Sequence, residues 1–313
     1  DRDQEIANFK PEQYFKLQAS FRKQNGELFE AVYHEGKEDK FKEKALLEDM
    51  ARWLEQSTAI VADKKVERKK EFPPFLFNLS NLQGYITSKY KGWTSDKVLK
   101  VAQSLYEKKY ITYPRTGSTA LEESLKDRAA KVLGTVKKGL PYEDEIKFTA
   151  SKRIFNNAKV ESHSAIIPTY VIPRTLGSDE SIVYSAIRNR FIMQFMPVAE
   201  HEETRIEVKA GQPDLKGLFK AKGRVQIIEG WRKVEQIESK DKTLPFVDIN
   251  EMLEIVKPEV TSHETKPPKH HTEKTLLRAM ETAGKNYEEE EAVLNGFSIG
   301  TPATRAETIK KLK

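Results

Sequence analysis

Strand-like sequence occurs in two stretches that are separated by a long region of helical pattern, and this interruption constrains the fold more than any other feature. Near the start, residues 14–21 and 28–33 flank Asn25-Gly26, a dipeptide typical of a hairpin turn. Far downstream, residues 200–210 again alternate apolar and polar side chains, as a half-buried strand does. We therefore expect a helical domain inserted into a β-rich one.

Proline-rich segments mark the borders of these regions. Phe72-Pro73-Pro74-Phe75 breaks regular structure after a strand predicted over residues 58–66. The segment 265–268 is a second break, and it precedes a helix that Thr272 is expected to cap.

Several helices are predicted from apolar spacing and capping residues. Residues 42–56 form an amphipathic helix whose expected buried face is Leu46, Met50, Trp53 and Leu54. Ser80 and Gln83 fit a capping box, and a second helix begins near Ser95. A strand over residues 110–113 follows directly. Such a pair of helices with a short turn resembles a helix-turn-helix.

Two further helices lie in the same region. One is expected to begin at Thr119, to bury Leu121, Leu125, Ala129 and Val132, and to stop at Gly134. The other covers residues 179–195. With the preceding pair, this indicates a unit like a winged helix.

Composition excludes several classes of protein. The 313 residues contain no cysteine, so disulfides, thiolate catalysis and cysteine-ligated zinc are excluded. No stretch approaches the roughly 20 apolar residues that span a bilayer, so we expect no membrane association. The net charge is +6, and the segment 83–115 holds seven basic residues against two acidic ones. A local excess of this kind favours an acidic partner such as nucleic acid.

Tyr113 is the first candidate for chemistry. It lies in Tyr113-Pro114-Arg115, where extended geometry before the proline would project the phenol and the guanidinium from one side of the chain. A cation near a phenol lowers the cost of its charged form and offers donors to phosphate. The alternative is an ordinary half-buried strand tyrosine, and spacing alone does not decide between them.

Two other segments have a functional and a structural interpretation. His163 lies between serines in Glu161-Ser162-His163-Ser164 and could donate to a phosphate, or it could be a surface residue. Thr301 and Pro302 are suited to the first positions of a helix, whose free amides could bind an anion or could simply be capped.

Taken in order, four segments of the chain resemble the type IA DNA topoisomerases. They are YITYPRTGS around Tyr113, HSAIIPT from His163, TKPP from Thr265 with the helix after it, and SIGTPATR from Ser298. The combination is more specific than any single match. The histidine and SIGTPATR segments favour the topoisomerase III branch. The usual aspartate is replaced by Gly117, which leaves the role of that carboxylate open.

The resemblance implies a multidomain α+β fold. It would contain a β-rich arch or gate domain (1–72 and 199–245), an inserted winged-helix-like domain with the nucleophilic tyrosine (73–198), and part of a further helical DNA-binding domain (246–313). It implies that Tyr113 attacks DNA and forms a 5′-phosphotyrosine, with Arg115 and His163 at the phosphate. Thr301, Thr304 and Arg305 would contact single-stranded DNA.

The resemblance also implies what this chain would lack. Family members hold Mg²⁺ in a Toprim domain, and we expect that domain to lie outside this sequence. Asp1, Asp3 and Glu5 have the spacing of its acidic cluster, but they lead directly into the arch, so we interpret the match as coincidence. The fragment alone would then be inactive, and it would be a cytoplasmic, nucleoid-associated monomer.

Two alternatives stay open at this point. A non-catalytic winged-helix DNA-binding module would explain the basic segment without chemistry. A structural scaffold would neither bind nor cleave DNA.

Overall fold

The computed structural model describes residues 1–211, 215–283 and 298–312. The chain divides into two compact units. We call the first the barrel unit; it comprises Asp1–Glu71, Ala199–Glu229 and Glu238–His270. We call the second the helical unit; it comprises Phe72–Val198, Gly230–Ile237 and His271–Lys313. The α+β class is thus confirmed, and each unit is described by itself.

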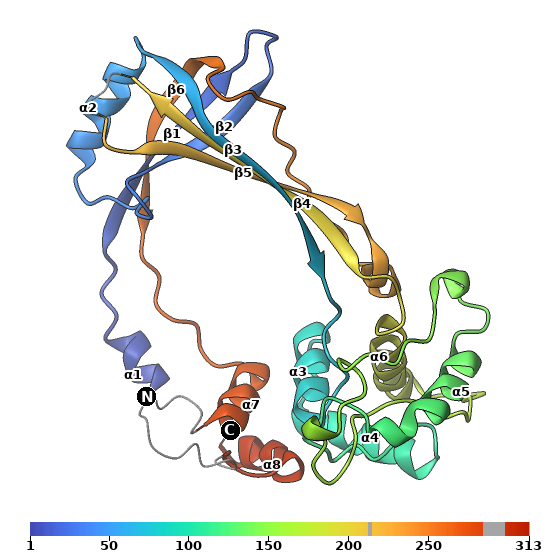
Figure 1. Cartoon of the computed structure of the whole chain (residues 1–313). Helices are drawn as coiled ribbons and strands as arrows, with labels where there is room; N and C mark the ends of the chain where they lie inside the picture. Colours follow the sequence, from blue (N-terminus) through green and yellow to red (C-terminus); the bar gives the residue numbers. More distant parts are fainter. Residues whose placement is uncertain (212–214, 284–297, 313) are drawn as a thin grey trace. The chain divides into compact units, whose positions relative to one another are not determined.

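Six antiparallel strands close into a barrel in the order β1-β2-β5-β4-β3-β6. Figure 1 shows the long strands β3, β4 and β5 running side by side. The bounds are β1 Gln13–Arg22, β2 Leu28–His34, β3 Thr58–Glu71, β4 Ala199–Ala210, β5 Leu218–Ile228 and β6 Met252–Glu264.

The predicted hairpin is confirmed. β1 pairs with β2 up to Arg22 and Leu28, and Gly26 between them has a φ of +90°, a conformation that glycine adopts without strain. Inward side chains of the strands form one apolar core, in which Phe219 packs on Phe21 and Tyr33 at centroid distances of 5.2 and 5.5 Å.

The predicted first helix is present as α2, Lys44–Leu54, but its expected buried face was partly wrong. Leu47, Ala51 and Leu54 are buried, whereas Leu46 is 56% and Trp53 40% exposed. The face of α2 that packs on the barrel begins at Leu47, one residue after the expected Leu46. Only one face of the helix can pack on β1 and β6.

β5 and β6 were not predicted, and β6 changes the assignment of residues 246–313. Met252–Glu264 was expected in a helical domain, but it pairs with β1 and with β3 and so closes the barrel. Buried Leu253 and Ile255 alternate with exposed residues at its start, but the alternation is lost from Val256 onward, so the pairing partners define most of it as a strand.

The helical unit is built from six α-helices and short 3₁₀ turns among the described residues. Small helix α1, Arg2–Ala7, belongs to the barrel unit. In the helical unit the bounds are α3 Leu79–Lys89, α4 Ser95–Glu107, α5 Lys126–Val136, α6 Ser178–Met193 and α7 Glu273–Thr282, followed by α8 Pro302–Leu312 after the undescribed residues. The 3₁₀ turns are η1 Glu123–Leu125, η2 Glu143–Glu145, η3 Asn157–Lys159 and η4 Gly230–Glu235.

The start of α3 differs from the prediction. The capping residue is Asn78, whose side-chain oxygen accepts from the amide of Asn81 at 2.8 Å. Ser80 and Gln83, expected as the capping box, are both buried inside the helix, and the Gln83 amide donates to the carbonyl of Ser95. The helix begins earlier because Leu79 and Leu82 both enter the core.

The helix expected from Thr119 begins later. Leu121 lies before it, in an isolated bridge with Phe155, and α5 runs from Lys126 through Gly134 to Val136. Thr119 therefore does not cap this helix, and Gly134 does not stop it, because Val132, Leu133 and Val136 continue the buried face past the glycine.

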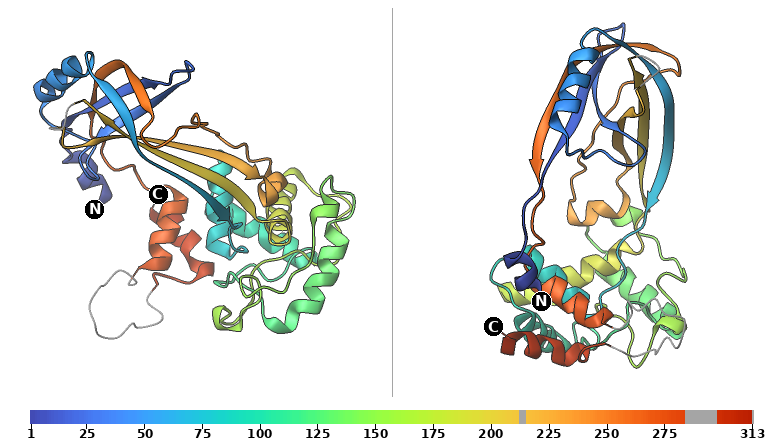
Figure 2. Two further views of the ribbon diagram at one scale, coloured as in Figure 1. Left: turned by 45° about the horizontal axis from the view of Figure 1, so that its top comes forward. Right: turned by 90° about the vertical axis from the view of Figure 1, so that its left-hand side faces the viewer.

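Other predicted helices are confirmed. α6 covers the expected region, and Thr272 caps α7 by accepting from the amide of Thr275 at 3.2 Å. α7 and α8 lie together in the views of Figure 2. Leu277 and Met280 of α7 and Ile309 of α8 form a small core. In the part of the chain that the structure describes, no helix is long and apolar enough to cross a membrane.

Candidate nucleic-acid cleavage site

Tyr113 and His163 are brought together, although 50 positions separate them. Their ring centroids are 4.5 Å apart, with an angle of 45° between the planes. The ring of Tyr106, on the last turn of α4, meets Tyr113 edge-on at 5.4 Å. Tyr113 is half-buried, so two aromatic neighbours fix its ring while part of its side chain stays accessible.

A few hydrogen bonds to backbone carbonyls hold the segment of Tyr113 beside the segment of His163. The amide of Thr112 donates to the carbonyl of Ile167 at 2.9 Å, and the hydroxyl of Thr116 donates to the carbonyl of His163 at 3.0 Å. The strand predicted over residues 110–113 is only a single bridge, between Ile111 and Pro168. A longer ladder is blocked because Pro114 and Pro168 have no amide hydrogen.

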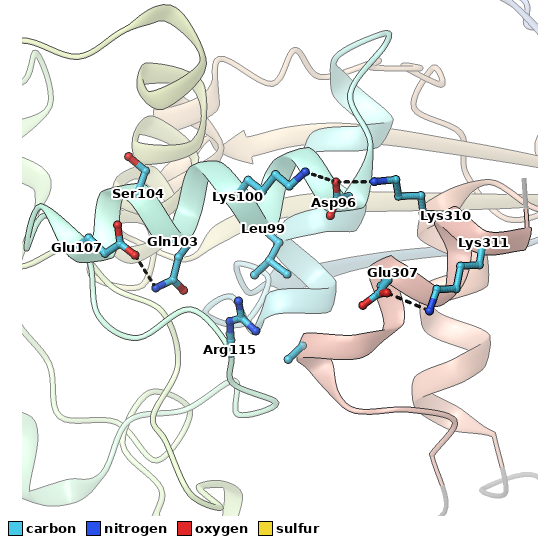
Figure 3. Close-up of a pocket in the computed structure, with 11 residues that line it drawn as sticks. Asp96, Leu99, Lys100, Gln103, Ser104, Glu107, Arg115, Glu307, Lys310 and Lys311 are labelled. Carbon is cyan, nitrogen blue, oxygen red and sulfur yellow. Dashed lines mark hydrogen bonds and ion pairs between the residues drawn. The ribbon is translucent and has the colours of Figure 1, made fainter.

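Arg115 is exposed and lines a cavity beside α4 and α8, where its side chain lies next to Leu99 and Gln103 (Figure 3). Among the residues that the structure describes, no hydrogen bond or ion pair engages its guanidinium. A cation on an exposed loop two residues after Tyr113 is thus available to an anionic ligand.

Gly117 faces the beginning of α8. A Cβ placed on Gly117 would have only Pro302 within 4 Å, at 3.8 Å, an ordinary van der Waals distance. The space beside this position therefore does not require glycine.

The start of α8 matches the prediction in its backbone, since the helix begins at Pro302. Thr301 and Thr304 are both exposed, and their hydroxyls lie 3.1 Å apart. Each could turn from this contact towards a ligand, so these two predicted contact residues lie at an accessible helix N-terminus.

Arg305, also predicted to contact DNA, occupies a different environment. It is 3% exposed, and its guanidinium donates to the hydroxyl of Ser80 at 3.1 Å and to the carbonyls of Ile299 and Gly300 at 3.1 and 3.2 Å. Burial lowers the pKa of the Arg305 guanidinium. Its donors are used inside the protein, where they tie the segment before α8 to α3, and its contact with DNA stays a prediction.

Acidic residues at the start of the chain do not assemble into a metal site. The Asp1 carboxylate caps α1 by accepting from the amide of Asp3, while Asp3 pairs with His270 at 3.1 Å and Glu5 with Arg2 at 3.6 Å. Within residues 1–211, 215–283 and 298–312, no three His, Cys, Asp or Glu side chains are grouped to hold a metal ion. The described residues therefore do not fit the Mg²⁺ that the resemblance implies.

Sequence reasoning missed Tyr106 and Gln103. Both lie on α4, and neither belongs to the matched segment around Tyr113. Their spacing of three residues places them as neighbours on the helix, a signal that becomes visible only when the end of α4 is known to pack on Tyr113.

Comparison with known proteins agrees with this arrangement. The family described as "DNA topoisomerase" matches residues 1–313. DNA topoisomerase 3 of Bacillus licheniformis is 33% identical over 99% of this chain, and that of Bacillus subtilis is 36% identical over 83%. The chain covers 44% and 38% of these relatives, less than half of their length.

Among solved structures, full-length topoisomerase I from Thermotoga maritima has a similar fold. The TM-score is 0.71 at 29% identity, and the match covers all of this chain and 48% of the other. The family match over the whole length, together with the topoisomerase 3 relatives, leads to one assignment: the chain belongs to the type IA DNA topoisomerases and is most like bacterial topoisomerase III.

Proposed function

We propose that this chain is the strand-cleaving part of a longer topoisomerase, and that Tyr113 is its nucleophile. The observation that carries the proposal is the placement of Tyr113 between His163 and Tyr106, with Arg115, which has no partner among the described residues, two residues away. A tyrosine nucleophile needs a fixed ring, an accessible hydroxyl and cations at the phosphate. Two aromatic neighbours fix the ring of Tyr113, part of its side chain is accessible, and Arg115 offers a cation.

In the proposed reaction, the Tyr113 oxygen attacks a phosphodiester of a single DNA strand. The bond from phosphorus to the tyrosine oxygen forms, and the bond to the 3′ oxygen breaks. The phenol loses its proton to solvent, and the departing 3′ oxygen gains one. Arg115 stabilises the charge on the phosphate oxygens, and His163 donates to them. Reversal reseals the strand without ATP, because the phosphotyrosine preserves the bond energy.

Between cleavage and resealing, another strand would pass through the gate. We propose that the barrel unit belongs to that gate, as an arch domain, and that the helical unit up to residue 198 is its winged-helix-like partner. Thr301 and Thr304 would contact the bound single strand. The isolated chain is proposed to bind DNA without cutting it, since the residues that the structure describes do not form a site for Mg²⁺.

The test is covalent capture. The complete protein, containing this chain and its metal domain, is incubated with end-labelled single-stranded DNA and denatured, and the adduct is resolved by gel. Tyr113→Phe should abolish the adduct, a loss of at least about a thousandfold. Tyr170→Phe, at a tyrosine that is 64% exposed, is the matched control and should leave it unchanged. An adduct that persists in Tyr113→Phe refutes the assignment.

A non-catalytic DNA-binding role is the second candidate for the chain by itself. It is favoured by the cations along α4, including Lys97, Lys100 and Lys108. Binding of the isolated chain to single-stranded DNA should weaken steeply as salt rises, with no adduct. If neither binding nor adduct is seen, the chain is a scaffold only.

A further inference from the structure

A groove lies between α4 and α8, with a volume of about 660 Å³. This is within the range of roughly 300–1,000 Å³ that is usual for sites of small ligands. The residues of α4 in the groove recur at intervals of three and four and so form one face of the helix. The lining is Asp96, Leu99, Lys100, Gln103, Ser104, Glu107, Arg115, Ala303, Glu307, Lys310 and Lys311.

Charges in the groove are partly compensated. The Asp96 carboxylate lies 2.9 Å from the ammonium of Lys100 and 3.8 Å from that of Lys310, and Lys311 pairs with Glu307 at 3.0 Å (Figure 3). Arg115 has no such partner among the described residues. Four cations face three carboxylates, so the groove has a small positive excess and one free guanidinium, which suits an anionic chain.

Gln103 supplies a second unused group. Its side-chain nitrogen donates to the Glu107 carboxylate at 3.2 Å, but its side-chain oxygen is buried and has no hydrogen-bond partner among the described residues. A buried carbonyl oxygen without a donor is unfavourable, so a ligand whose N–H group meets this oxygen when the side chain turns towards the groove gains a hydrogen bond.

We propose that this groove holds the first nucleotides of the DNA strand that remains attached to Tyr113, and that Gln103 accepts a hydrogen bond from a base. This rests on the proposed function. A 5′-phosphotyrosine leaves the downstream strand on the enzyme. That strand must begin beside Tyr113, whose ring packs on Tyr106, one turn of α4 beyond Gln103.

Three features of the groove support this path for the downstream DNA strand over a path elsewhere on the protein surface. Arg115 connects the nucleophile's segment to the groove directly. Leu99 gives an apolar surface, 7% exposed, on which a base can lie. Lys310 and Lys311 stand at the other end of the groove, where a second phosphate would arrive (Figure 3).

Crosslinking from a trapped adduct tests the path. The photoreactive amino acid benzoylphenylalanine replaces Gln103 in the complete protein, and a second variant carries it at Lys311. Each is reacted with a single-stranded oligonucleotide that is cleaved but cannot be resealed, and is then irradiated. Crosslinks should fall on the first few nucleotides downstream of the break. The control position is Lys131, on the exposed face of α5.

The outcomes separate the two proposals. If no adduct forms in the unmodified protein, the proposed function fails. If the adduct forms but both groove positions crosslink no better than Lys131, the path is wrong. Should the bulky group at Gln103 prevent the adduct, the Lys311 variant decides.

The base contact has its own measurement. An abasic site at the first downstream nucleotide should lower the equilibrium fraction of adduct about three- to tenfold, the value of one neutral hydrogen bond. In Gln103→Leu the same abasic site should have a smaller effect, because the acceptor is already gone and only the contact of the base with Leu99 is lost. An undiminished effect in Gln103→Leu rules out the contact.

Discussion

The two units use their charged side chains in opposite ways. In the barrel unit, the Glu203 carboxylate is 8% exposed and lies within 4 Å of Lys69, Arg205, Lys222 and His201. In the helical unit, Arg115 has no partner within the described part of the chain. In the barrel, Glu203 forms ion pairs with side chains of the neighbouring strands. Near Tyr113, the Arg115 guanidinium and the Gln103 side-chain oxygen have no partner among the described residues. Unused donors and acceptors, more than charge itself, distinguish the region that can bind a ligand.

Emptying the barrel core should have the largest effect on stability. Phe219→Ala removes a fully buried ring that contacts Phe21 and Tyr33, and should cost about 3–5 kcal/mol of unfolding free energy. Chemical unfolding can be followed by fluorescence in a variant whose only tryptophan is Trp53. Phe219→Leu, which leaves a smaller cavity, should cost less. Equal losses would mean that ring packing does not stabilise the barrel.

Substitution of Arg305, in the helical unit, should lower the unfolding free energy, as a substitution in the barrel core does. Arg305→Ala leaves the Ser80 hydroxyl and two carbonyls without their donor and should cost about 2–4 kcal/mol. Arg305→Lys should recover only part, because an ammonium cannot reproduce the planar fork. Weaker DNA binding by Arg305→Ala without loss of stability would contradict this role and restore the predicted DNA contact.

Removing the charge of Glu203 should have a smaller, pH-dependent effect. The hydrogen bond from Lys69, with the nearby Lys222, lowers the pKa of Glu203 from 4.5 to about 2. Its contribution to stability is therefore complete above the unfolded value of 4.5 and is lost as the pH falls towards 2. Unfolding free energies of Glu203→Gln should vary less with pH over that interval. An unchanged pH profile would show that the three cations, Lys69, Arg205 and Lys222, do not depend on this carboxylate.

Arg115→Ala should have the smallest effect on stability, within about 0.5 kcal/mol, because the side chain is exposed and has no partner in the described part of the chain. The same variant should lose most of the covalent adduct in the complete protein. Arg115→Lys, which keeps the charge but not the fork, should lie between. If Arg115→Ala is strongly destabilising, the guanidinium is not free, and the contrast between the units is weaker than it looks.

Local signals predicted much of the fold. Asn25-Gly26 located the first hairpin, and Thr272 located the start of α7, because turn and capping chemistry depend on adjacent residues. β6 was missed because its strand character depends on β1 and β3, which are far away in the sequence. Which stripe of α2 is buried likewise depends on the barrel, not on the helix.

The site was predictable where a motif carried it. Tyr113 and His163 were both identified, and the structure places their rings in contact. Arg305 also lies in a matched motif. Its partner Ser80 is 225 positions away, so no local sequence pattern could show that its donors already form hydrogen bonds inside the protein. Roles of Tyr113, Arg115 and His163 in cleavage stay predictions until the adduct is measured.

Gly117 bears on how this chain relates to others of its family. The family's usual residue there is aspartate, and the space beside Gly117 would accept a side chain, with Pro302 no closer than 3.8 Å. The first side-chain atom of an aspartate would therefore fit here without a shift of the loop backbone, so the position can hold either residue in the same loop at the level of its Cβ.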